Sequence, residues 1–225
     1  ANYGGGAYIS ERAQITATAL MSNTAGTFGS FYGGGGLYAY ASAQLRDTRI
    51  ISNSAYGDGA GAIFANGDNV SQVTIIGGSV ERNTNPFGAA YNAGGILLAA
   101  NATISGTRFL SNAAQSLGGA ILAQRSLTLT NVDVIGNSSG SDGGGVYVDG
   151  FAGSVAARIQ GSLLERNASG RDGGGAWSVW TVRRTAGNDD YRENNPRWWL
   201  EARPEAIVFP EAEPHTLIDD FRVYR

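Results

Sequence analysis

Hydrophobic and polar residues alternate over short segments, and the same arrangement returns along the first 180 residues of the chain. Each segment of three to five residues is interrupted by Gly, Asn, Ser or Asp. This period of two is typical of β-strands with one buried face, and no helical spacing of apolar residues occurs in the repeat. The pattern therefore predicts an all-β chain built from short strands.

Two residue types mark each copy of the repeat. A glycine run opens the copy, and an asparagine follows that has a hydrophobic residue three positions before it; the clearest copy runs from Gly118 to Asn137. The glycine-to-asparagine distance is 18 residues in four copies, and the shortest repeat has 25 residues. The glycines that anchor the copies, named the bend glycines, are Gly5, Gly35, Gly61, Gly94, Gly119, Gly144 and Gly174. The asparagines, named the ladder asparagines, are Asn23, Asn53, Asn83, Asn112, Asn137 and Asn167.

Four apolar columns run through the repeats. Two lie eight and three positions before the asparagine, as in Leu129 and Val134, and two lie two and four positions after the glycine, as in Ile121 and Ala123. A repeat this short cannot bury its apolar face alone, so successive copies must stack. We predict three short strands per coil and a single-stranded parallel β-helix of about seven coils over residues 1–180. At about 4.8 Å per coil it is roughly 30 Å long, and the preference of parallel crossovers makes it right-handed.

The two marker columns are expected to be structural. At a bend, an asparagine tolerates a left-handed backbone, and its amide can donate to and accept from the asparagines one coil above and below. A glycine column marks a second bend, where a positive φ or close packing excludes a Cβ atom. We therefore assign no catalytic chemistry to either column.

The combination of a Gly-Gly-Ala-Ile motif with a hydrophobic-x-x-Asn motif resembles the repeats of the polymorphic outer-membrane proteins, which are bacterial autotransporter adhesins. Gly118 to Ile121 match the first motif literally, and Phe109 to Asn112 match the Phe-x-x-Asn form of the second. The likeness covers about residues 4–180. It implies a right-handed parallel β-helix exposed at a bacterial cell surface, with a role in adhesion.

Composition narrows the classes of function. The net charge of −3 gives no basic footprint for nucleic acid. Cysteine is absent, which excludes disulfides and thiolate chemistry. Glycine, at 34 residues, fits a solenoid rich in bends. No run of 18 apolar residues occurs, so we expect no membrane span.

The two ends of the chain differ from the repeats. Residues 1–3 lead directly into a glycine run, so either the chain is a fragment or a partner covers the first coil. Residues 181–225 carry no further repeat, and strands and loops rich in Trp and Pro are expected there. This segment is predicted to cap the last coil or to dock on a neighbour, with Trp198 and Trp199 as the candidate contacts.

One column is predicted to face outward as an interaction stripe, three positions after the bend glycines. If alternation holds, its side chains form a continuous apolar and aromatic surface, which suits lateral contact with an identical subunit or stacking on sugar rings. The alternatives are that these residues point inward or that the C-terminal segment covers them. The stripe residues are Tyr8, Tyr38, Phe64, Leu97, Leu122, Tyr147 and Trp177.

The repeats contain few candidates for catalysis. A carbohydrate-cleaving β-helix would cluster carboxylates for acid and base roles, whereas the ten acidic residues of the repeats scatter over its frame. Asp142 and Asp172 occupy the same position in consecutive coils, where they could hold a calcium ion or cap a turn. The only histidine, His215, lies outside the repeats.

The sequence therefore favours a non-catalytic extracellular structural or adhesive protein, without a cofactor, that self-associates end to end into a surface filament or layer. Contact that does not close on itself gives a homopolymer. A host surface or a carbohydrate is the other expected ligand. The alternative hypothesis is a β-helix that binds or cleaves a polysaccharide as a lyase or glycosidase.

Overall fold

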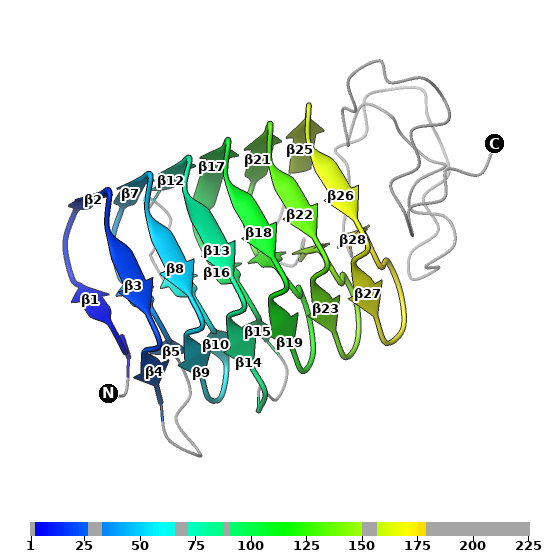
Figure 1. Cartoon of the computed structure of the whole chain (residues 1–225), viewed down its shortest axis with the longest axis horizontal. Coiled ribbons are helices and arrows are strands. Elements are labelled where there is room, and N and C mark those ends of the chain that lie inside the picture. Colours follow the sequence, from blue (N-terminus) through cyan, green and yellow to red (C-terminus); the bar gives the residue numbers. More distant parts are fainter. Residues whose placement is uncertain (1–2, 27–32, 66–71, 88–90, 150–156, 179–225) are drawn as a thin grey trace.

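The computed structural model describes residues 3–26, 33–65, 72–87, 91–149 and 157–178, and in them the chain forms a parallel β-solenoid (Figure 1). Each turn of the chain adds one strand to each of four sheets that run the length of the solenoid. No helix occurs in the described ranges, so none of their residues forms a helix able to cross a membrane. The all-β parallel β-helix predicted from the repeats is confirmed.

The first sheet follows the bend glycines and consists of β1 (Ala7–Ile9), β6 (Leu37–Ala39), β11 (Ile63–Ala65), β16 (Ile96–Leu98), β20 (Ile121–Ala123), β24 (Val146–Val148) and β28 (Ala176–Ser178). The second sheet consists of β2 (Ala13–Thr16), β7 (Ala43–Arg46), β12 (Gln72–Ile76), β17 (Asn101–Ser105), β21 (Leu127–Thr130) and β25 (Ala157–Gln160).

The third sheet precedes the ladder asparagines and consists of β3 (Ala19–Met21), β8 (Arg49–Ile51), β13 (Ser79–Glu81), β18 (Arg108–Leu110), β22 (Asp133–Ile135) and β26 (Leu163–Glu165). The fourth sheet follows the asparagines and consists of β4 (Thr24–Ala25), β9 (Ser54–Ala55), β14 (Thr84–Asn85), β19 (Ala113–Ala114), β23 (Ser138–Ser139) and β27 (Ala168–Ser169). A short additional sheet consists of β5 (Gly33–Gly34), β10 (Gly59–Ala60) and β15 (Asn92–Ala93).

The sequence repeat sets the register between coils. Equivalent residues of neighbouring repeats pair directly, as Ile121 pairs with Val146 and Val134 pairs with Leu164. The four apolar columns predicted from the repeats form one core along the solenoid. Alternation along each strand thus places one set of side chains inside and the other outside.

The prediction of three strands per coil was one short. The strand that follows each asparagine has only two residues, for example β23, and these strands carry Ser, Thr, Ala and Asn instead of large apolar residues. A two-residue segment is too short for alternation to be visible, and its pairing with the coils above and below forms the strand.

The coil of residues 3–26 leaves one edge of every sheet without a neighbouring strand in the described structure. Its core residues Ile15 and Leu20 are only partly buried, whereas Leu45 and Ile50, their partners in the next coil, are each 1% exposed. Figure 1 places this coil at one end of the solenoid, in blue. Among the described residues, the core side chains of this coil are therefore less buried than those of the next coil.

Candidate functional site

A continuous row of asparagine side chains runs through the interior of the solenoid. Each amide Nδ2 donates to the Oδ1 of the asparagine in the following coil, over 2.9 to 3.0 Å. That Oδ1 also accepts the backbone N–H of the preceding asparagine. Five of the six asparagines are at most 1% exposed, and Asn23 in the first coil is partly buried. The predicted ladder is present in all six coils.

The amides also fasten each coil to the strand before it. Asn112 Nδ2 donates to the carbonyl of Val80, and Asn137 Nδ2 donates to the carbonyl of Phe109. An interior asparagine therefore uses both Nδ2 hydrogens as donors and accepts two bonds at Oδ1. Since buried amide groups must be paired, this position accepts few other side chains.

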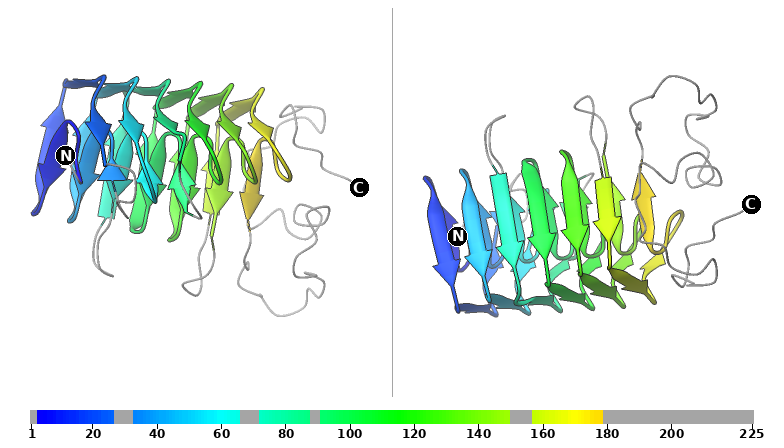
Figure 2. Two further views of the ribbon diagram at one scale, coloured as in Figure 1. Left: turned by 90° about the horizontal axis from the view of Figure 1, so that it is seen from below. Right: turned by 90° about the horizontal axis from the view of Figure 1, so that it is seen from above.

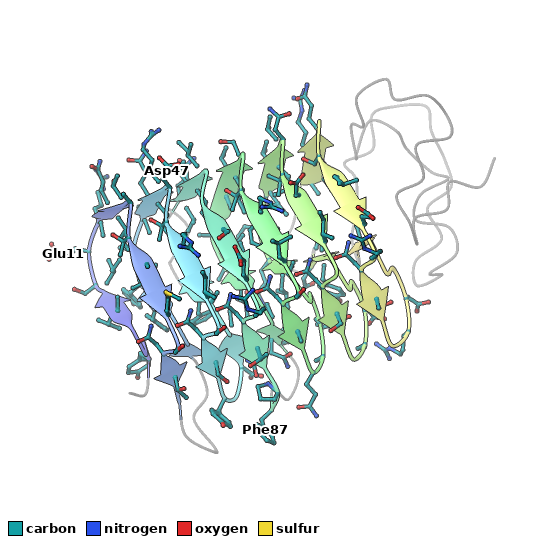
Figure 3. The ribbon with its side chains drawn as sticks, viewed as in Figure 1. Glu11, Asp47 and Phe87 are labelled. Carbon is teal, nitrogen blue, oxygen red and sulfur yellow. The ribbon has the colours of Figure 1, made fainter. Side chains whose placement is uncertain are left out.

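The left-handed backbone lies beside the ladder and not on it, which corrects the expectation for the asparagines. The residue directly before each ladder asparagine has a positive φ, as in Ser52 (54°) and Arg166 (52°). A second column with positive φ lies six positions before the asparagine and includes Asp47 (49°), labelled in Figure 3. The two columns bound the third sheet on either side, so its strands have only three residues. The sequence signal for the second column was its residue types, because Gly, Asp and Asn adopt a positive φ more readily than other residues. They occur there at Gly77, Asp47 and Asn131.

The bend glycines are required by close packing. A Cβ atom on Gly119 would fall on the backbone of Gly144 and Ser138, and one on Gly61 would fall on Gly94 and Thr84. The glycine run of each coil thus lies directly against the fourth sheet. Of the two reasons expected for this column, positive φ does not apply at any of the seven glycines, and close packing applies at the six from Gly5 to Gly144.

The predicted outward stripe is not an exposed surface over most of its length. Only Tyr8 is exposed, at 53%, whereas the five stripe residues from Tyr38 to Tyr147 are between 0% and 7% exposed. They stay apart from the main core and form a second apolar cluster with Ala60, Ala93 and Leu117. These three residues lie one or two positions before a bend glycine, so the chain at these places packs over the outer face of the first sheet. The side chain of Trp177 lies outside the described part.

Because the stripe is covered, it offers no open face for sugar rings or for a lateral partner. Its rings pack on one another instead. The rings of Tyr8 and Tyr38 are nearly parallel, with centroids 5.4 Å apart, and the ring of Tyr38 meets that of Phe64 edge-on, with centroids 5.1 Å apart. At the first coil the stack ends with the exposed rings of Tyr8 and Tyr3, whose centroids are 5.9 Å apart. The interaction surface predicted along the side of the solenoid is therefore reduced to its end.

A polar cluster lies at the other end of this covered stripe. Asp142 is 6% exposed, and its Oδ2 accepts bonds from Arg171 at 2.6 Å and from the hydroxyl of Ser141 at 3.0 Å. Its Oδ1 is buried without a partner. Burial raises the pKa of Tyr147, and the negative charges of Asp149 and Asp142 raise this pKa further. The sequence could not indicate this cluster, because the repeat frame does not show that the segment before the glycine folds onto the first sheet.

The calcium site considered for Asp142 and Asp172 finds no support in this geometry. The Asp142 carboxylate already has the guanidinium of Arg171 as its counter-charge. Among the described residues, no three His, Cys, Asp or Glu side chains lie close enough together to hold a metal ion. Trp198, Trp199 and the whole segment 181–225 lie outside the described residues, so their predicted role as a cap or docking contact stays a prediction.

Comparison of this chain with protein-family models, with curated proteins and with solved structures finds no match. The residues and their geometry are thus the basis for assigning a function.

Proposed function

We propose that this protein is a non-catalytic structural or adhesive β-solenoid of a bacterial cell surface, and that it self-associates end to end into a filament or layer. The observation that carries the proposal is the direction of the asparagine ladder. In every bond between two ladder asparagines, the donor lies in one coil and the accepting Oδ1 lies in the following coil. The two ends of the solenoid are therefore complementary.

The unused groups at the two ends match. Asn23 Oδ1 accepts no hydrogen bond in the described structure, although the same atom accepts two in every later coil. At the other end, the backbone N–H of Asn167 has no acceptor among the described residues, and its Nδ2 donates only to the carbonyl of Val134. Asn167 of one copy could donate to Asn23 of the next, and this continuation of the ladder requires β1 of the next copy to take the place of β28 beside β24.

The rest of the first coil supports the same contact. Among the described residues its strands have no neighbour on one side, and such edges are templates for pairing with another chain. Ile15 and Leu20 expose part of the core there, and the ring of Tyr8 is half exposed. In a head-to-tail contact each copy keeps one unoccupied end, so further copies can add and a filament forms.

The joint can be tested by measuring mass by light scattering over a concentration series. We expect the mass of the wild-type protein to increase with concentration. Asn23→Lys replaces the free acceptor with a charged donor at the joint, so this variant should stay monomeric. Thr16→Lys is the matched control, because it adds the same charge to an exposed side chain on the outer wall of the same coil.

Two outcomes would contradict the proposal. A wild-type protein that stays monomeric at every concentration would remove the basis for a polymer. Association that is equally strong in Asn23→Lys would place the contact elsewhere on the molecule. Circular dichroism of each variant ensures that a loss of assembly is not a loss of folding.

A further inference from the structure

The outer face of the second sheet carries an uncharged array of hydroxyl side chains on its three middle strands, β12, β17 and β21. Thr74, Thr103 and Thr128 pair in register in one column, and Ile76, Ser105 and Thr130 pair in the next. Alternate residues of the same strands fill the core, so these side chains face outward. The hydroxyl face is defined as Thr74, Ile76, Thr103, Ser105, Thr128 and Thr130.

The hydroxyl groups of this face differ from those at the bends. At the bend before the third sheet, Thr48 and Thr107 donate to backbone carbonyls, for example Thr107 to Gly77 over 3.0 Å. In the described structure, the side-chain oxygens of the hydroxyl face have no hydrogen-bond partner in the protein, and Thr103 is exposed. Their partners must therefore be water or an external ligand.

The charges lie outside the face. Arg46 on β7 pairs with Ile76, and Arg158 on β25 pairs with Thr128, so the two arginines border the three middle strands. The middle strands present no ionisable side chain on this face. Such a surface lacks the charge that would attract an ionic ligand or a phosphate backbone.

The hydroxyl groups repeat on a regular grid. Neighbouring strands lie about 4.8 Å apart, and outward residues of one strand recur at about 6.6 Å. Threonine side chains have restricted χ1 rotamers, which keeps their oxygens and methyl groups in repeating positions. The right view of Figure 2 shows the strands of this sheet side by side and nearly parallel, with even spacing. Water bound to such a grid is held in a repeating layer.

We propose that the hydroxyl face binds ice. An ice surface is a periodic lattice of water oxygens with similar spacings, and it is neutral and flat like this face. Ordered water on the threonine rows would join the lattice, while the methyl groups would fit between its oxygen rows. The inference does not depend on end-to-end association, because one chain contains the complete array.

The test is an assay of ice recrystallisation, together with thermal hysteresis, on the purified protein. The wild-type protein is expected to slow the growth of ice grains and to change the shape of single ice crystals. Thr103→Lys puts a charged chain in the centre of the array and should abolish both effects. Leu163→Lys is the matched control and should keep them, because it adds the same charge at an exposed position of the third sheet.

Two results would overturn the proposal. The first is a wild-type protein that affects ice no more than serum albumin does. The second is undiminished activity in Thr103→Lys, which would exclude this face. If that variant does not fold, the double change Thr103→Val and Thr128→Val removes two hydroxyl groups while keeping the shape, and it should lose most of the activity. Retained activity in the double variant would equally overturn the proposal.

Discussion

At the scale of single residues, the ladder asparagines combine two tasks that no other side chain performs equally well. Asn112 donates to Val80 and Asn137 and accepts two bonds from Asn83. All of these groups are buried, so each lost partner leaves a polar atom without hydration. The ladder therefore stabilises the coil stack mainly by preventing unpaired groups.

Replacing Asn112 with Leu should lower the free energy of unfolding by about 3 kcal/mol or more, because neighbouring buried amide groups lose their partners. Chemical denaturation monitored by circular dichroism measures this change. Asn23→Leu is the control and should have a smaller effect, since Asn23 is partly buried and its Oδ1 accepts no bond from the described residues. Equal losses in the two variants would show that the ladder contributes no more in the interior than at the end.

Tyr147 provides a prediction on pH dependence. Its pKa is raised in the folded protein, so above the ordinary tyrosine pKa of about 10 the unfolded chain ionises first. The stability contributed by neutral Tyr147 is complete below that pH and is lost as the pH rises further. Tyr147→Phe should therefore lose less stability than the wild type between neutral and strongly alkaline pH.

Thermal unfolding at several pH values measures this difference. Tyr40→Phe, a change at an exposed tyrosine, is the control and should follow the wild type. An alkaline loss that is the same in the Tyr147→Phe variant and in the wild type would contradict the assigned environment of Tyr147.

At the scale of elements, the glycine run and the fourth sheet form the narrowest part of each coil. Gly119 is in backbone contact with Ser138 and with Gly144 of the next coil, so no side chain fits between them. Gly136 has another role: its φ is 64°, and a Cβ atom there would have Ser111 Oγ as its nearest contact, at 3.7 Å. Gly119 is therefore required by close packing, whereas Gly136 is required by its backbone conformation.

Gly119→Ala should destabilise the protein by more than about 3 kcal/mol, because backbone segments must move apart. Gly136→Ala should cost only about 1 kcal/mol, the strain of a left-handed alanine. Denaturation midpoints of both variants test the difference. The reverse order would contradict the close packing described for Gly119.

The sequence was informative where the repeat is regular and silent where distant segments meet. Alternation around Leu129 and Val134 predicted the strands and the core, and the spacing of Asn112 and Asn137 predicted the ladder. The burial of Tyr147 could not be predicted, because it depends on how the segment before the bend glycine folds over the first sheet. The αL position before each asparagine was also missed, since Ser and Arg there do not indicate a positive φ.

At the scale of the whole molecule, the solenoid has a direction, because its two ends present different groups. One end presents the acceptor Asn23, a partly exposed core and the ring of Tyr8. The direction of the ladder favours head-to-tail contact over contact between like ends. Such contact would extend the core and the ladder through the joint.

The most direct measurement is negative-stain imaging of the purified protein across a concentration series. We expect short rods at low concentration and unbranched fibres at high concentration, one solenoid wide and with an axial period of roughly 30 Å, about six strand spacings. Asn23→Lys should give only short rods, and Thr16→Lys should give fibres. Short rods of the wild-type protein at every concentration would contradict end-to-end assembly.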